Sequence, residues 1–146
     1  ILLDTNILIH REAAGAFNED IGVLFNWLDT LHYEKWTHPD SLVEIRGHQD
    51  AKVIKVMEIK LKNYHLLKTI AADDDKITEL RAQLDRPGNQ NDRFDTNILK
   101  SAYMNRVDIL ISEDRGIHRK AMHLNISDRV YTIADFLEKV TAENPG

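Results

Sequence analysis

The sequence contains no cysteine, which excludes disulfide bonds, thiolate metal ligands and cysteine nucleophiles and fits a reducing compartment. Its six glycines form neither a P-loop nor a dinucleotide-binding fingerprint, so neither kind of nucleotide site is expected. The seven histidines include no His-Glu-x-x-His pattern, which argues against a histidine zinc site. No apolar run reaches membrane-spanning length and no basic-then-apolar leader opens the chain, so we expect a cytoplasmic protein without a membrane partner.

What the chain does contain is the composition of an ordinary single domain. Of its 146 residues 42% are hydrophobic and 29% are charged. The net charge of −5 argues against a general nucleic-acid coat protein, which should be basic, but it is compatible with an acidic enzyme site that holds cations. Because the chain opens with Ile1 rather than Met and ends at Asn144-Pro145-Gly146, we expect one domain, residues 1–146, excised from a longer protein.

Short apolar segments alternate with segments of helical periodicity along the whole chain. Strands are expected at residues 1–3, 34–38, within 64–70, at 108–112 and at 130–132. Helices are expected at residues 7–14, 21–31, from 41 onward, at 51–63, after the acids at 73–75 and ending before 86, at 92–106, at 116–123 and after 132, with a loop over 15–20. This alternation predicts βαβ units, and therefore an α/β fold in which helices cover both faces of a parallel sheet.

Capping patterns mark three of the expected helix starts. Ser41 and Glu44 have the spacing of a capping box, with Ser41 as the N-cap. Asp92 is the expected N-cap of the next helix, which places Asp95 one turn further in, on the stripe that packs against the sheet. Thr132 is expected to cap the last helix.

Four acids recur at comparable junctions of strands and helices: Asp4, Glu44, Asp95 and Asp114. The carboxyl ends of parallel strands form the edge where ligands bind. Carboxylates that converge there repel one another unless a cation lies between them, and Mg²⁺ prefers such oxygen ligands. A site of this kind can activate water for attack on a phosphodiester. Spacing alone leaves a second interpretation open, in which each acid only caps a helix or completes a capping box.

Four blocks of sequence, taken in order, resemble the signature blocks of the PIN-domain family: Asp4-Thr5-Asn6-Ile7-Leu8, Ser41-Leu42-Val43-Glu44-Ile45, Asp95-Thr96-Asn97-Ile98-Leu99-Lys100-Ser101-Ala102 and Leu110-Ile111-Ser112-Glu113-Asp114. The resemblance covers nearly the whole chain. It implies three α/β/α layers around a five-stranded parallel sheet of order 3-2-1-4-5, which would bring Asp4 and Asp114 together where strands one and four are neighbours. It also implies cleavage of RNA that depends on Mg²⁺ or Mn²⁺.

Carried over residue by residue, the resemblance assigns roles to individual residues of these blocks. The catalytic acids would be Asp4, Glu44, Asp95 and Asp114, of which Asp4, Asp95 and Asp114 would hold the metal, with Asp92 as the alternative third acid and Thr5, Asn6 and Ser112 as hydrogen-bonding supports. Many family members are toxins paired with antitoxins. RNA is therefore the expected substrate, and an antitoxin or other protein and a second copy of the chain are candidate partners.

Two other classes of function remain compatible with the sequence. One is a catalytically silent scaffold that binds RNA or protein, because a fold does not fix a function. The other is a metal-dependent phosphatase with Asp4 as the nucleophile, although the second Asp that such enzymes commonly carry two residues later is missing. Basic residues near the acidic blocks, Arg119 and Lys120 among them, could bind RNA phosphates or simply form a solvated surface.

Overall fold

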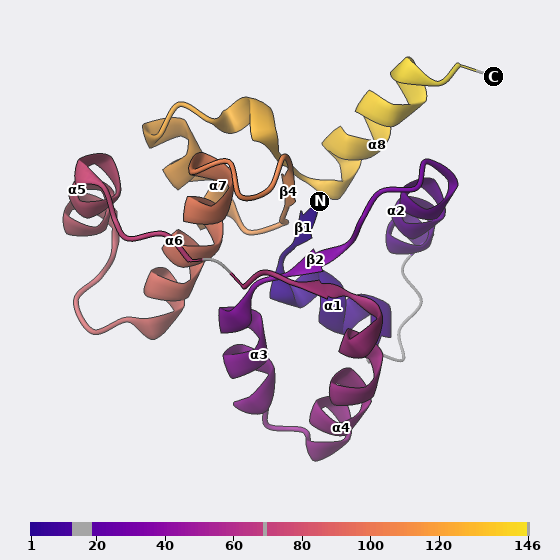
Figure 1. The fold of residues 1–146 in the computed structure, drawn as a ribbon, viewed down its shortest axis with the longest axis horizontal. Coiled ribbons are helices and arrows are strands. Elements are labelled where there is room, and N and C mark those ends of the chain that lie inside the picture. Colours follow the sequence, from indigo (N-terminus) through magenta and orange to yellow (C-terminus); the bar gives the residue numbers. More distant parts are fainter. Residues whose placement is uncertain (13–18, 69, 146) are drawn as a thin grey trace.

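The computed structural model describes residues 1–12, 19–68 and 70–145, which fold into helices around a parallel sheet (Figure 1). The sheet has five strands in the order β3-β2-β1-β4-β5. Each strand is two residues long: β1 (Leu2–Leu3), β2 (Trp36–Thr37), β3 (His65–Leu66), β4 (Leu110–Ile111) and β5 (Val130–Tyr131). The predicted α/β fold and its strand order are confirmed.

Strand β1 lies at the centre of the sheet because both of its side chains can be buried. Leu2 pairs with Trp36 on one side and Leu110 on the other, and Leu3 pairs with Ile111. Leu2 and Leu3 are fully buried, each in a different core, as expected for successive residues of a strand. This arrangement makes β1 and β4 neighbours, so the residues that follow them emerge side by side.

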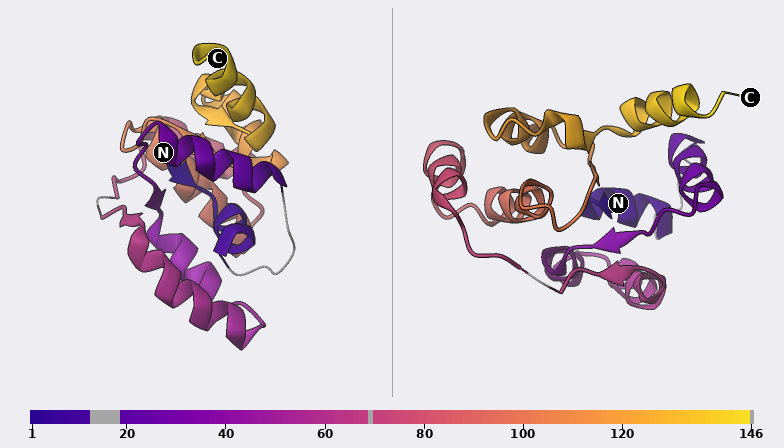
Figure 2. Two further views of the ribbon diagram at one scale, coloured as in Figure 1. Left: turned by 90° about the vertical axis from the view of Figure 1, so that its right-hand side faces the viewer. Right: turned by 45° about the horizontal axis from the view of Figure 1, so that its top comes forward.

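Helices cover both faces of the sheet, as Figures 1 and 2 show. They are α1 (Thr5–Glu12), α2 (Glu19–Thr30), α3 (Pro39–Arg46), α4 (Ala51–Lys60), α5 (Asp75–Leu84), α6 (Gln90–Tyr103), α7 (Arg115–His123) and α8 (Ile133–Glu143), with 3₁₀ turns η1 (Leu61–Asn63) and η2 (Ser127–Arg129). In both views of Figure 2, α2 and α8 lie next to each other, and the right-hand view places α5 at the opposite end. None of the helices formed by residues 1–12, 19–68 and 70–145 combines the length and apolar character that a membrane span needs.

Two apolar cores result, one on each face. The first core contains Leu3 and Ile111 with side chains from α1, α2, α3, α4 and α8, and the second contains Leu2 and Leu110 with side chains from α5, α6 and α7. Fully buried Leu24, Leu28 and Phe136 anchor the first core. Burying side chains of this size contributes about 1.5–3 kcal/mol each, so the two cores hold the short strands in place.

The boundaries of several elements differ from the predictions. The first helix begins at Thr5 rather than residue 7, because the Asp4 carbonyl already accepts hydrogen bonds from the next turn, and the predicted end of this helix and most of the following loop lie outside the described residues. The strand predicted over residues 34–38 is reduced to Trp36–Thr37. Thr132 caps α8, as predicted, by accepting from the Asp135 amide.

Candidate active site

Asp4 immediately follows β1 and is held in a fixed orientation under the edge of the sheet. Its backbone amide donates to the Ile111 carbonyl of β4 (3.1 Å), which continues the sheet by one residue. Its carboxylate is 6% exposed. One oxygen accepts from the Thr5 amide (2.8 Å) and the other from the Ser112 hydroxyl (2.7 Å). These two donors partly compensate the cost of burying the carboxylate.

Ser112, which follows β4, joins the two strand ends. Its hydroxyl donates to Asp4 and accepts from the Asp114 amide (3.0 Å). The Asp114 carboxylate in turn caps α7 by accepting from the amides of Gly116 (2.7 Å) and Ile117 (3.2 Å). Asp114 is therefore a helix cap and also a neighbour of Asp4. The interpretation of Asp114 as a helix cap is thus compatible with its interpretation as a site carboxylate.

Glu44 reaches the same strand end from α3. The Thr5 hydroxyl donates to Glu44 Oε1 (2.8 Å) and lies 2.8 Å from the Ser41 hydroxyl. The predicted capping box is wrong. Helix α3 begins at Pro39 and is capped by His38, whose Nδ1 accepts from the Asp40 amide (3.0 Å). Because α3 starts two residues earlier than predicted, Ser41 and Glu44 lie within this helix. Their side chains face Thr5 of α1 instead of the first turn of α3.

Asp95 comes from the second turn of α6, not from the first. The predicted N-cap is also wrong: Asn89 caps α6 by accepting from the Asp92 amide (3.0 Å). The Asp92 carboxylate binds Arg86 instead, accepting from its backbone amide (2.9 Å), Nε (2.8 Å) and Nη2 (3.0 Å). Asp92, the alternative third acid, is thus committed to Arg86, and its pKa is lowered by those hydrogen bonds.

The four acids lie close enough for the charge of one to affect the ionisation of another. Burial raises the pKa of Asp95 to about 7, and the charges of Asp114, Asp4 and Glu44 raise it as well. Burial raises the pKa of Asp4 too, and Asp114 adds to this effect against the hydrogen bonds from Ser112 and Thr5. The pKa of Glu44 is raised by burial and then by Asp4, Asp40 and Asp114. Carboxylates drawn from β1, α3, α6 and the β4–α7 junction therefore share one region.

This donor set fits a hard divalent cation in its chemistry. Carboxylates whose ionisation is opposed by burial and by like charge are stabilised when a cation neutralises them. Asp4, Asp95 and Asp114 could hold such an ion, with Glu44 beyond them. Within the described residues, however, no three histidine or acidic side chains already have the spacing of a metal site. The side chains would have to draw together on binding.

Two cavities meet at Asp114. The first, which we call the α6–α7 cavity, has a volume of about 590 Å³ and is lined by Asp95, Asp114, Arg86 and Arg119 among others. The second, the α1–α2 cavity, has a volume of about 510 Å³ and is lined by Asp4 and Asp114 together with Asn6. Asn6 lies on the exposed side of α1, and none of the side-chain hydrogen bonds described for the chain involves it.

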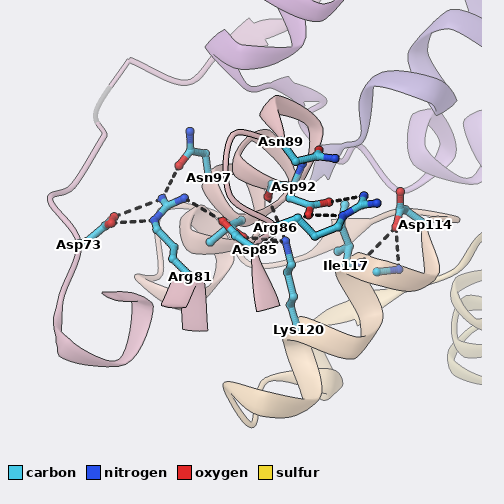
Figure 3. A network of polar contacts seen from close by, with 12 residues as sticks. Asp73, Arg81, Asp85, Arg86, Asn89, Asp92, Asn97, Asp114, Ile117 and Lys120 are labelled. Carbon is cyan, nitrogen blue, oxygen red and sulfur yellow. Dashed lines mark hydrogen bonds and ion pairs between the residues drawn. The ribbon is translucent and has the colours of Figure 1, made fainter. Parts of the chain in front are cut away.

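An ion network that the sequence did not reveal joins α5, α6 and α7 around Lys120 (Figure 3). Lys120, for which the sequence left RNA binding and a solvated surface position open, is instead only 5% exposed and points inward. Its ammonium group donates to the Asp92 carbonyl (2.9 Å) and the Thr96 hydroxyl (2.8 Å) and pairs with Asp85 (2.8 Å). The only signal in the sequence is helical spacing, which places Lys120 three residues after the buried Ile117.

Comparison of the chain with protein-family models, curated proteins and solved structures found no match. Its function therefore has to be inferred from the chemistry of the site itself.

Proposed function

We propose that this protein is an endoribonuclease that hydrolyses RNA phosphodiester bonds with Mg²⁺ or Mn²⁺. One observation carries the proposal: Asp95 is partly buried near Asp4, Glu44 and Asp114 at the ends of β1 and β4, and burial together with the charges of these three acids raises its pKa to about 7. A concentration of opposed carboxylates at the switch point of a parallel sheet is costly to fold and suits a cation-dependent site.

Each acid has a role in this proposal. Asp4, Asp95 and Asp114 hold the cation, which when bound stabilises the charge that develops on the phosphodiester and lowers the pKa of water. The Ser112 hydroxyl fixes the orientation of Asp4, and the α7 amides fix that of Asp114. Glu44 accepts the Thr5 hydroxyl on Oε1, which leaves Oε2 to orient the attacking water and take its proton.

The proposal extends to location and partners. RNA is the substrate and the cytoplasm is the location. An antitoxin or another protein, and a second copy of the chain, are candidate partners. Co-purification from cells and light scattering of the pure protein test these two candidates separately from the nuclease activity.

The sharpest test replaces Asp4 with Asn. Asp4→Asn should abolish cleavage of single-stranded RNA while the circular dichroism spectrum stays unchanged, because Asn keeps the side chain's size and removes a negative ligand. Millimolar Mg²⁺ or Mn²⁺ should raise the melting temperature of the wild type through binding to the folded state. Asp4→Asn and Asp114→Asn should each lose most of that rise.

Asp108→Asn is the matched control, because it makes the same chemical change in an exposed residue before β4, at the other end of the strand. This variant should keep both cleavage and the rise in melting temperature. Undiminished metal-dependent cleavage by Asp4→Asn would refute the proposal. A wild type that binds RNA with neither turnover nor a metal-induced shift would be a silent scaffold, and one that traps a phosphate mimic at Asp4 and ignores RNA would be a phosphatase.

A further inference from the structure

The two cavities that meet at Asp114 differ in charge. The α1–α2 cavity is lined by four acids, Asp4, Asp20, Glu113 and Asp114, and its described lining residues include His10 but no lysine or arginine. The α6–α7 cavity is lined by Asp92, Asp95 and Asp114, and equally by Arg86, Arg119 and Lys120. A polyanionic RNA backbone is repelled on the first side, whereas the second side offers cationic side chains that can bind its phosphates.

From this asymmetry we infer that the RNA backbone on one side of the cleaved bond is bound in the α6–α7 cavity, where Arg86 and Arg119 bind its phosphates. This inference rests on the proposed function and adds the position of the substrate to it.

Arg86 is held in place for such a role. It is exposed, but Asp92 binds Nε and Nη2 of its guanidinium and also its backbone amide. Two of the five guanidinium hydrogens are used in this pair, and among the described residues no other acceptor takes up the rest. Figure 3 shows the guanidinium extending from Asp92 toward the side of the cavity where Asp114 lies. An arginine fixed in this way loses little side-chain entropy when it binds a phosphate.

Arg119 and Lys120 are adjacent in α7 but have different tasks. Lys120 is buried, and its ammonium group is bonded to Asp85, to the Asp92 carbonyl and to the Thr96 hydroxyl. Arg119 is exposed on the wall of the same cavity, and it forms no ion pair with any residue that the structure describes. Its positive charge is therefore available to a ligand. Arg86 and Arg119 can therefore bind RNA phosphates, whereas Lys120 stabilises the packing of α7 against α5 and α6.

The test measures RNA affinity apart from catalysis. In the Asp4→Asn protein, binding of a short fluorescein-labelled single-stranded RNA is followed by fluorescence anisotropy over a range of salt concentrations, without and with Mg²⁺. Arg86→Gln and Arg119→Gln should each raise the Kd about five- to tenfold and reduce the slope of log K against log salt by about one, the effect of one lost phosphate contact. Arg86→Lys should fall between Arg86→Gln and the parent, because it keeps the charge and loses the planar fork.

Arg106→Gln is the matched control. Arg106 is exposed in the segment between α6 and β4, at the amino end of the sheet, and does not line either cavity at Asp114. The control should bind RNA within about twofold of the parent, as expected for a distant, screened charge. Equal losses in Arg106→Gln and the two cavity variants would overturn the inference, since the attraction would then be general.

The same variants with Asp4 intact separate this inference from the proposed function. Arg119→Gln should raise KM for RNA while keeping kcat and the Mg²⁺-induced rise in melting temperature. Cleavage with an unchanged KM in both cavity variants would overturn the inference and leave the nuclease assignment standing. The wild type could also show neither cleavage nor a metal-induced rise in melting temperature. If the two cavity variants then still lost RNA affinity, the result would support the binding site and refute the nuclease.

Discussion

The two faces of the sheet are held in different ways. On the first face, α2 and α8 pack through apolar side chains such as Leu24 and Phe136. On the second face, the apolar core is bordered by ion pairs, and the buried lysines of the described residues, Lys100 and Lys120, both belong to the helices of this face. The apolar face tolerates small shifts of one helix against another, whereas a buried ion pair loses most of its interaction energy when its geometry changes.

The ionic face is also the face that carries Asp95. Lys120 bonds to the Asp92 carbonyl and to the Thr96 hydroxyl, residues on either side of Asp95 in α6. Thr96 donates to Asp85 (2.7 Å), so the end of α5 is joined to the same point. The comparison teaches that stability and positioning are divided between the faces: the apolar face supplies bulk stability, and the ion network fixes the turn of α6 that holds a site carboxylate.

Lys120→Met should have the largest effect of the changes that test this division. It removes the closer cation of the Asp85 carboxylate, which among the described residues keeps only Arg81 at 3.6 Å, and it takes a donor from the Asp92 carbonyl, so we expect a loss of about 3–5 kcal/mol in the free energy of unfolding, measured by urea denaturation. The double variant Lys120→Met with Asp85→Leu should be less destabilised than Lys120→Met alone, because it also removes the carboxylate that Lys120 neutralises.

The apolar counterpart is Leu24→Ala, which should cost about 2–5 kcal/mol through lost burial and the cavity left behind. Leu24→Ala should leave the ligand binding of the folded protein, to RNA and to metal, unchanged. Lys120→Met should weaken metal binding as well as stability. Equal effects of the two substitutions on metal binding would contradict the division between the faces.

The raised pKa of Asp95 predicts a pH dependence of intermediate size. Because its pKa in the folded state is near 7 and its ordinary value is near 4, the folded protein is favoured while Asp95 is protonated, and stability is lost as the pH rises from about 4 to 7. Without a divalent cation, the unfolding free energy of the wild type relative to Asp95→Asn should fall by about 2 kcal/mol between pH 4.5 and 7.5. This is about half of the free energy that the full pKa shift would give, because the side chain is partly exposed and solvent screens its charge.

This difference between two proteins isolates Asp95 from other groups. The pKa of the buried His38 is lowered by burial, so its contribution is lost in the opposite direction, as the pH falls, and it cancels when the variant is compared with the wild type. Parallel curves for the two proteins over this pH range would show that Asp95 is not strained by its neighbours.

The smallest effects should come from the start of α6. Asn89→Ala removes the N-cap and should cost about 1 kcal/mol in the free energy of unfolding, measured by thermal or urea denaturation. Asp92→Ala should cost less, because its ion pair with Arg86 is on the surface. The larger consequence of Asp92→Ala should be weaker RNA binding, since Arg86 would lose its fixed orientation. A larger loss of stability in Asp92→Ala than in Asn89→Ala would contradict the assignment of the cap.

The alternation of strands and helices was predictable because its signals are local, whereas the order of the strands came from the resemblance of the four sequence blocks. Apolar residues such as Leu2 and Leu110 are buried on both sides, and the parallel order follows from helices between the strands. The juxtaposition of Asp4 and Asp114 was predictable through that strand order, because both residues follow strands that it makes neighbours. The part of the site that depends on strand ends thus follows from the sequence.

The helix starts were harder to predict because several residues compete for the same capping position. Pro39 moves the start of α3 upstream, so that His38 caps it in place of Ser41. In α6, Asn89 and Asp92 are both good caps, and the turn at Gly88, whose φ is +71°, selects Asn89. The buried role of Lys120 was not predictable, since only the tertiary packing of α5 against α6 and α7 brings Asp85 to its ammonium group.

The bond between the Ser112 hydroxyl and Asp4 spans 108 positions of sequence, and it has a consequence for how the protein folds. Closing so long a loop is entropically costly, and chains dominated by distant contacts fold slowly. The two strand ends meet only when β1 and β4 pair. The carboxylates of the two ends therefore come together only with this pairing, and a chain in which β1 and β4 are still apart does not carry their mutual repulsion.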